Sequence, residues 1–150
     1  MQAPQVRPLA EEDFARWREL WTAYNAFYAN PNPSEEITRV LWSRLFDPAE
    51  PVHGLAAGPL GAPLGFTHYI YHRNTWMIAP VCYLQDLFTA PEARGRGVAR
   101  ALIEGVYEAA RAAGSPRVYW LTHEANATAR RLYDQVAERS GFLQYRKNLT

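Results

Sequence analysis

Apolar residues recur at intervals of three and four between residues 11 and 28, a spacing typical of one face of a helix. The proline-rich turn from Asn30 to Ser34 ends this helix, because each proline biases the preceding residue away from helical geometry. Ser34 suits the N-cap of a second helix, which Asp47-Pro48 ends. The predicted apolar faces hold Phe14, Trp17, Leu20, Trp21, Tyr24 and Tyr28 in the first helix, and Ile37, Val40, Leu41, Leu45 and Phe46 in the second.

The middle of the chain changes to shorter apolar segments that are separated by turn residues. Segments 52–57, 64–72 and 81–89 predict three strands, with glycine, proline and Arg-Asn turns between them. Consecutive antiparallel pairing is the simplest arrangement for these strands. Residues 6–9 predict a short first strand, and its proline suits the edge of a sheet.

The last third of the chain returns to helical spacing. Residues 98–113 predict an amphipathic helix with Gly114 after its end. Segments 117–121 and 142–147 predict strands, and residues 126–139 predict the helix between them. The sequence therefore predicts a mixed α/β fold in which a helix crosses between two neighbouring strands.

Length and composition favour one folded domain over residues 1–150. Lys plus Arg number 16 and Asp plus Glu 15, and this balance argues against nucleic acid as the main partner, since phosphate neutralisation needs a basic surplus. Cys82 is the single cysteine, which excludes an intrachain disulfide and is consistent with a reducing cytoplasm. The acidic N-terminal residues are not those of a signal peptide, and no apolar run approaches the ~20 residues of a membrane span. We therefore expect a cytoplasmic protein that binds neither nucleic acid nor membrane.

The segment from Asp86 to Ala99 contains the clearest chemical signal. A predicted strand ends, a turn with two glycines follows, and an amphipathic helix begins at once. Backbone N–H groups at a helix start are unpaired and lie at the positive end of the helix dipole. Glycine lets a ligand approach this backbone closely, and Arg94, Arg96 and Arg100 add positive charge. The pattern predicts a site for phosphates, and the alternative is a basic surface turn.

Three other motifs are excluded by spacing. The turn has no lysine, so it is not a Walker A loop, and Arg100 stands where a dinucleotide fingerprint needs its third glycine. His123-Glu124 begins a pattern known from zinc helices, but Ala127 replaces the second histidine. We therefore expect no metal.

The run Arg94-Gly95-Arg96-Gly97-Val98-Ala99 resembles the Arg/Gln-x-x-Gly-x-Gly/Ala loop of the GNAT acetyltransferase superfamily. The preceding strand, the long helix, the next strand and Asn126 before the last helix follow the family order. Residues 118–147 are most similar to the branch that includes histone- and polyamine-acetylating enzymes. The resemblance implies a mixed, mostly antiparallel sheet of six to seven strands flanked by four helices, with a V-shaped splay between the fourth and fifth strands.

The resemblance also implies acetyl-CoA as cosubstrate. The loop backbone would hold the pyrophosphate, and the end of the preceding strand, separated from the next strand by a bulge, would pair with the pantetheine arm. Asn126 would contact the same arm or serve only as an N-cap. The residues expected at the cosubstrate are Leu87, Phe88, Thr89, Arg94, Gly95, Arg96, Gly97, Val98, Ala99 and Asn126.

The implied reaction is direct transfer of the acetyl group to a primary amine in a ternary complex. Tyr133 lies where many family members have a catalytic tyrosine. It is the candidate acid that would protonate the departing thiolate. The alternative is a tyrosine that only packs in the core. Asp86 is a candidate base, an ammonium anchor or a residue that hydrogen-bonds backbone. Gln85 stands where polyamine-acetylating relatives often have a glutamate, and it cannot act as a base. Glu124, which is also a candidate contact to the substrate amine, and solvent water are further candidates for the base.

The acceptor amine is expected near the end of the first predicted helix. Tyr24 and Tyr28 lie in a region that often walls the acceptor site in this superfamily, and their aromatic faces suit a cation. The competing interpretation is core packing plus a dimer contact. His68 and His72 share a strand face, and we interpret them as surface or acceptor-cleft residues.

The sequence therefore predicts a homodimeric N-acetyltransferase that acts on a small-molecule primary amine. Two alternatives stay open. One is a non-catalytic acyl-CoA-binding sensor, which glutamine in place of glutamate at position 85 suggests. The other is a protein or peptide lysine acetyltransferase, which would need an open peptide groove.

Overall fold

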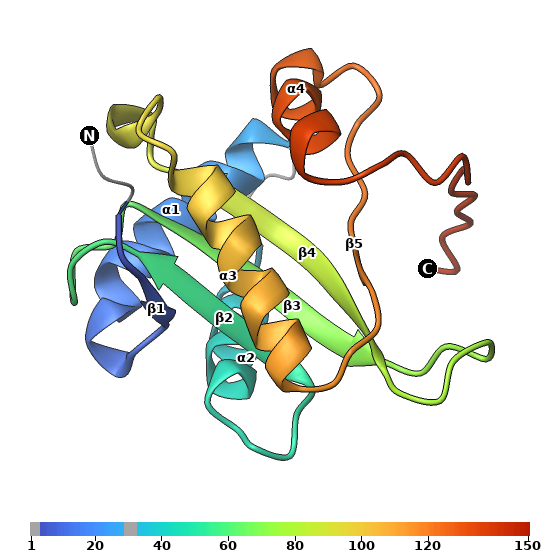
Figure 1. Ribbon diagram of the computed structural model, residues 1–150. Helices are drawn as coiled ribbons and strands as arrows, with labels where there is room; N and C mark the ends of the chain where they lie inside the picture. The colour runs from blue at the N-terminus through green and yellow to red at the C-terminus, as the bar shows by residue number, and fades with distance from the viewer. Residues whose placement is uncertain (1–3, 29–32) are drawn as a thin grey trace.

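The computed structural model describes residues 4–28 and 33–150, in which five strands form one sheet in the order β1-β2-β3-β4-β5. The first four strands pair antiparallel, and β5 pairs parallel to β4 (Figure 1). Most of the predicted turn from Asn30 to Ser34 lies outside the described residues. The strands are β1 (Val6–Pro8), β2 (Val52–Ala57), β3 (Gly65–His72), β4 (Val81–Thr89) and β5 (Val118–Tyr119).

Helices cover both faces of this sheet. α3 crosses one face, and α1 and α2 lie on the other (Figure 1). Short 3-10 turns precede α1 and α3. The four predicted helices are confirmed as α1 (Phe14–Phe27), α2 (Glu35–Leu45), α3 (Val98–Ala112) and α4 (Ala127–Val136). The last of them ends three residues earlier than its sequence pattern predicts.

Close packing of α3 on the sheet depends on a glycine in β3. A Cβ atom at Gly65 would lie 2.7 Å from the Val98 side chain and 2.7 Å from the Phe88 carbonyl oxygen. Any larger residue would therefore push α3 away from β3 and β4. Leu102 and Ile103 of α3 are fully buried against this surface, and their burial fixes where the N-terminus of the helix lies.

The apolar face predicted for α1 is confirmed, whereas that of α2 is partly wrong. Trp17, Leu20 and Trp21 are buried in the core. In α2, Ile37 and Val40 are exposed, because Trp42 takes the inward position and packs 4.6 Å from the Trp17 ring centroid. This rotation turns the predicted apolar stripe partly toward the solvent.

The strand predicted at 142–147 is wrong, and the sheet has five strands in the described residues rather than six to seven. The chain after α4 continues without helix or strand and leaves the body of the molecule (Figure 1). Its apolar pattern favours a strand, but a strand needs a neighbour for its backbone groups, and no described segment supplies one. The exposed apolar residues of this segment are Phe142, Leu143, Tyr145 and Leu149.

None of the helices in the described residues has the length and apolar character that a membrane-spanning helix requires.

Candidate active site

The site is organised around an irregularity in β4. His68 of β3 pairs with Asp86, and the next residue, Tyr69, pairs with Leu84, so Gln85 has no counterpart. An extra residue of this kind is a β-bulge, which bends a strand and increases its local twist. The register shift agrees with the bulge that the family resemblance implies for this strand.

Beyond the bulge, β4 has a free edge. β5 pairs with β4 only at Cys82 and Tyr83, and no other described strand pairs with that edge. On its opposite edge β4 stays paired with β3 as far as Thr89. The backbone from Leu87 to Thr89 can therefore pair with an extended ligand, as a further strand would.

The free edge leads into the N-terminus of α3. Gly95 and Gly97 have φ values of 79° and 77°, a left-handed conformation that favours glycine, and Gly97 is the N-cap of α3. No side chain caps this helix, and its first turn contains no acidic residue. The unpaired amides of this turn are therefore suited to an anion.

The three arginines near this helix start are not equivalent. Arg94 and Arg96 are exposed in the turn. The guanidinium of Arg100, by contrast, donates a hydrogen bond to Gln135 of α4. The mobile positive charge at the anion site therefore comes from the first two.

Asp86, the residue next to the bulge, lies at the centre of a polar cluster. Its Oδ1 accepts a hydrogen bond from the Tyr24 hydroxyl at 2.8 Å, and its Oδ2 lies 2.9 Å from His68 Nδ1. The Asp86 side chain is 13% exposed, so the carboxylate is largely buried and still reachable. This contact brings together two residues that the sequence analysis names separately, Asp86 and Tyr24.

α4 completes the cluster. Asn126 is the N-cap of α4 through its side-chain oxygen, as one sequence interpretation predicts, and its side chain also hydrogen-bonds Tyr28 at the end of α1. Tyr28 packs 5.1 Å from the Tyr24 ring centroid. Tyr133, on the same helix as Asn126, interacts electrostatically with both tyrosines.

Burial keeps the tyrosines of the cluster protonated. Burial first, and then the interaction with neighbouring Tyr28, raises the pKa of Tyr133 to about 12. Burial and the neighbouring Asp86 carboxylate raise the pKa of Tyr24 further still. For Tyr28, burial and Asp86 raise the pKa and outweigh the opposing hydrogen bond from Asn126. All three phenols are therefore hydrogen-bond donors at neutral pH.

The structure does not place His68 on the surface and does not place Glu124 in contact with the cluster. His68 is 1% exposed, so it is a buried residue and not a surface residue. Glu124 lies exposed in the turn before α4, where its backbone carbonyl accepts a hydrogen bond from Arg130. The described contacts of Glu124 do not include the Asp86 cluster. No group of three metal-ligating side chains occurs in residues 4–28 and 33–150.

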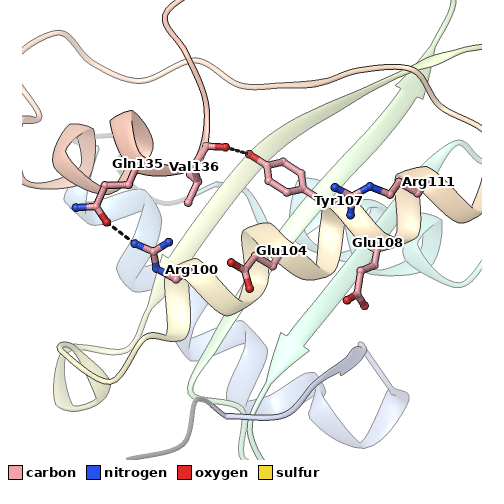
Figure 2. A pocket seen from close by; sticks show the side chains of 7 residues that line it. All are labelled: Arg100, Glu104, Tyr107, Glu108, Arg111, Gln135 and Val136. Carbon is pink, nitrogen blue, oxygen red and sulfur yellow. Dashed lines mark hydrogen bonds between the residues drawn. The ribbon is translucent and has the colours of Figure 1, made fainter.

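A hollow on the outer side of α3 lies apart from this cluster. It faces the end of α4, where Tyr107 donates a hydrogen bond of 2.8 Å to the Val136 carbonyl (Figure 2). Charged residues of both signs line it, and Asp86 and Tyr133 are not among them. The residues that line it are Arg100, Glu104, Tyr107, Glu108, Arg111, Gln135 and Val136.

A comparison with known families identifies the family of this chain. The model of the acetyltransferase (GNAT) family matches residues 16–137, and the chain belongs to that family. It is therefore an acyltransferase of the N-acetyltransferase class.

Named relatives support this class. The chain is 35% identical to the D-amino-acid N-acetyltransferase HPA3 of Saccharomyces cerevisiae over 145 residues, which cover 95% of this chain and 89% of the relative. It is 34% identical to the thialysine N-epsilon-acetyltransferase of Caenorhabditis elegans over 57% of this chain and 52% of the relative. Neither name refers to histones or polyamines, so the comparisons do not confirm that branch.

A solved structure has the same fold. The aminoglycoside N-acetyltransferase AAC(6')-Iy in complex with CoA superposes with a TM-score of 0.82, over 100% of this chain and 98% of that chain. The sequence identity is 17%, so this similarity concerns the fold alone.

Proposed function

We propose that this protein moves an acetyl group from acetyl-CoA to the primary amine of a small molecule by direct transfer in a ternary complex. The observation that carries the proposal is the sequence of features along β4. The strand places a largely buried carboxylate, a free backbone edge and an uncapped helix N-terminus in series. These features suit, in that order, the amine, the pantetheine arm and the pyrophosphate.

The residues present fit the cosubstrate. A Cβ atom added at Gly95 would meet nothing within 4 Å, so a phosphate can approach this backbone without hindrance. The amides from Gly95 to Ala99 would hold the pyrophosphate, with Arg94 and Arg96 beside it. The backbone of Leu87, Phe88 and Thr89 would pair with the pantetheine arm, and this arm would lie in the V-shaped splay that the family resemblance implies between β4 and β5.

Asp86 is suited to bind the acceptor as an ammonium ion. Each carboxylate oxygen already accepts one hydrogen bond and keeps capacity for another. The rings of Tyr24 and Tyr28 offer aromatic faces to a cation beside it. Glu124 remains a prediction for a second contact to the amine. The ammonium ion loses one proton to the solvent, and the neutral amine then attacks the thioester carbonyl.

Tyr133 assists the leaving group. As the new N–C bond forms, the C–S bond breaks and the sulfur receives the electron pair. The nitrogen then releases its second proton to the solvent, which leaves a neutral amide and the CoA thiolate. Complete transfer of the phenol proton is uphill, because the pKa of Tyr133 is about 12, whereas a thiol has a pKa of ~8.5. Tyr133 therefore acts by donating a hydrogen bond to the developing thiolate.

The names of the two relatives favour an amino-acid-like acceptor, since one acts on D-amino acids and the other on thialysine. We would incubate the protein with acetyl-CoA and four amine classes: D-amino acids, lysine analogues, polyamines and a lysine peptide. Thiol release should be fastest with the amino-acid amines. Release with the peptide alone would identify a protein acetyltransferase.

A binding measurement distinguishes the proposed enzyme from a non-catalytic acyl-CoA sensor. Calorimetric binding of CoA without thiol release from any amine would identify a non-catalytic sensor, which the exposed Gln85 at the bulge favours. Absence of both binding and release would contradict the proposal.

A homodimer fits the distribution of exposed apolar residues. The C-terminal segment and the hairpin between β3 and β4 both extend from the β5 side of the molecule (Figure 1). Trp76 and Ile78 of this hairpin are 84% and 97% exposed, and Phe142 and Tyr145 are 84% and 93% exposed. Large apolar side chains at such exposure are typical of a surface that a partner covers. A second copy of this chain is the proposed partner, and the cytoplasm, where the buried Cys82 would stay reduced, is the proposed location.

A further inference from the structure

A buried histidine lies next to the proposed acceptor site and has no part in the reaction described above. His68 is 1% exposed in the middle of β3. Its ring packs 4.7 Å from the Phe66 centroid and 5.5 Å from that of Trp21. Aliphatic residues fill such a position without needing hydrogen-bond partners, so a polar side chain here requires explanation.

The hydrogen bonds of His68 fix which ring nitrogen carries the proton. The Trp17 indole Nε1 lies 3.0 Å from His68 Nε2. An indole N–H can only donate, so Nε2 is the acceptor and carries no hydrogen. The hydrogen of the neutral ring is therefore on Nδ1, which donates to Asp86 Oδ2 at 2.9 Å.

These contacts form a continuous chain of hydrogen bonds between two points of one helix. The chain runs from Trp17 through His68 to Asp86, whose other oxygen accepts from the Tyr24 hydroxyl. Trp17 and Tyr24 both belong to α1, two helical turns apart on one face. The chain thus connects α1 to β4 at the residue beside the bulge.

We propose that His68 is a positioning residue, whose Nδ1–H group, oriented by Trp17, holds the Asp86 carboxylate in the rotamer that faces the acceptor amine. This inference rests on the proposed function, in which Asp86 binds the ammonium ion. A carboxylate with one donor on each oxygen cannot turn about its Cβ–Cγ bond without losing both. The remaining lone pairs therefore keep one direction, which is how outer hydrogen bonds orient a binding group.

A matched pair of variants tests the role of Nδ1. Asparagine at position 68 places its amide nitrogen near the Nδ1 position and keeps a donor for Asp86, whereas glutamine places its amide near Nε2. His68→Gln should lower kcat/KM for the amine by about ten- to a hundredfold, the effect of one hydrogen bond to a charged group. His68→Asn should restore most of this loss. The KM for acetyl-CoA should stay unchanged in both variants.

His53→Gln is the control for histidine replacement. His53 lies on the neighbouring strand and stacks on Tyr69, which faces the opposite side of the sheet from His68. The His53→Gln variant should keep the kinetic constants of the wild type. Equal losses in His53→Gln and His68→Gln would overturn the inference.

A double-mutant cycle separates positioning from a general loss of stability. If His68 acts through Asp86, His68→Gln should cause no further loss of kcat/KM in an Asp86→Asn background. Additive losses would show that His68 acts independently of Asp86 and would overturn the inference. An enzyme inactive on every amine would overturn the proposed function, whereas wild-type rates in His68→Gln would overturn this inference alone.

Nitrogen-15 spectra of the imidazole rings in the folded protein give a readout that does not depend on activity. His68 should show the tautomer with hydrogen on Nδ1, and Trp17→Phe should weaken this preference because it removes the donor to Nε2. A hydrogen on Nε2 in the wild type would contradict the proposed chain.

Discussion

At the scale of single residues, the site separates groups that are visible in the sequence from one that is not. Asp86 and Tyr133 are candidates that follow from the family resemblance. The sequence indicates His68 only as a surface or acceptor-cleft residue, because the role proposed for it depends on Trp17, which is 51 residues away in the chain. Short local motifs indicate chemistry, whereas a buried hydrogen-bond chain requires the tertiary structure.

Replacement of Tyr133 by phenylalanine removes the hydroxyl and keeps the ring. We expect kcat to fall by about ten- to a hundredfold, since one hydrogen bond to a developing charge is lost. Steady-state kinetics and calorimetry should show the fall in kcat with unchanged acetyl-CoA affinity. Tyr107→Phe is the matched control, because the Tyr107 hydroxyl bonds only to the Val136 carbonyl among the described contacts. An unchanged kcat in Tyr133→Phe would remove this residue from the mechanism.

The raised pKa of Tyr133 has a consequence for the pH dependence of the reaction. Because this pKa is about 12, the phenol keeps its proton up to roughly pH 11. Any loss of kcat between pH 8 and roughly pH 10 must then come from another group. The pH profile of kcat should therefore have the same alkaline limb in the wild type and in Tyr133→Phe. An alkaline limb that disappears in the variant would contradict this assignment.

Asp13 provides a prediction on stability rather than catalysis. It is fully buried and accepts hydrogen bonds from Arg7, the Ala10 amide and the Gly61 amide. Burial alone would raise the pKa of Asp13, but these hydrogen bonds outweigh it and lower the pKa below its ordinary value. The stabilisation is therefore present above the ordinary pKa of ~3.9 and is lost as the pH falls through the lowered value.

Asp13→Asn should lower the free energy of unfolding by about 3 kcal/mol at pH 7, because Arg7 loses its buried partner. Urea denaturation at neutral and acidic pH checks this, and the difference from the wild type should shrink in acid. Glu19→Gln removes the partner of an exposed ion pair with Arg16 and should change stability by less than about 1 kcal/mol. Equal effects of the two substitutions would contradict the account.

At the scale of elements, local sequence patterns predict the helices and the central strands. They do not predict strands that form only by pairing with distant segments. α1, α3 and β2 to β4 lie within a few residues of their predicted ends. β5 has only two residues, and the last predicted strand is absent from the described chain, because strand formation depends on a neighbour. The bulge at Gln85 also has no local signal and was expected only from the family resemblance.

The N-terminus of α3 can be tested with two glycines in the same backbone conformation. Gly95 and Gly114 have φ values of 79° and 76°, and an added Cβ would meet nothing within 4 Å at either. Alanine at each should cost about 1 kcal/mol of stability through the left-handed backbone. Only Gly95→Ala should weaken acetyl-CoA binding, by about tenfold or more, because its methyl group would enter the phosphate site. Calorimetry that finds equal affinity in both variants would contradict the placement of the pyrophosphate.

At the scale of the whole molecule, the sheet is open where the chain ends. β5 and the C-terminal segment lie on one side, and four large apolar side chains of that segment are exposed. A single chain leaves this surface in water, whereas a homodimer would cover it. The proposed dimer therefore explains why the sequence pattern at 142–147 is that of a strand although the described chain forms none there.

Light scattering of substituted proteins checks the dimer. The wild type should be a dimer, and Leu143→Glu together with Tyr145→Glu should shift it toward the monomer by placing charges in the covered surface. Gln144→Glu adds a charge to the same segment at a polar position and should leave the dimer intact. A wild-type protein that is monomeric at all concentrations would contradict the proposal.

Recognition of acetyl-CoA by the main chain at the start of α3 is the claim on which the functional account depends. Nitrogen-15 amide spectra recorded during a titration with acetyl-CoA test it most directly. The amides of residues 94–99 and those at the free edge of β4 should shift in a saturable manner, while Gly114 at the far end of α3 should not. Amides of residues 94–99 that stay in place at saturating acetyl-CoA would contradict the account.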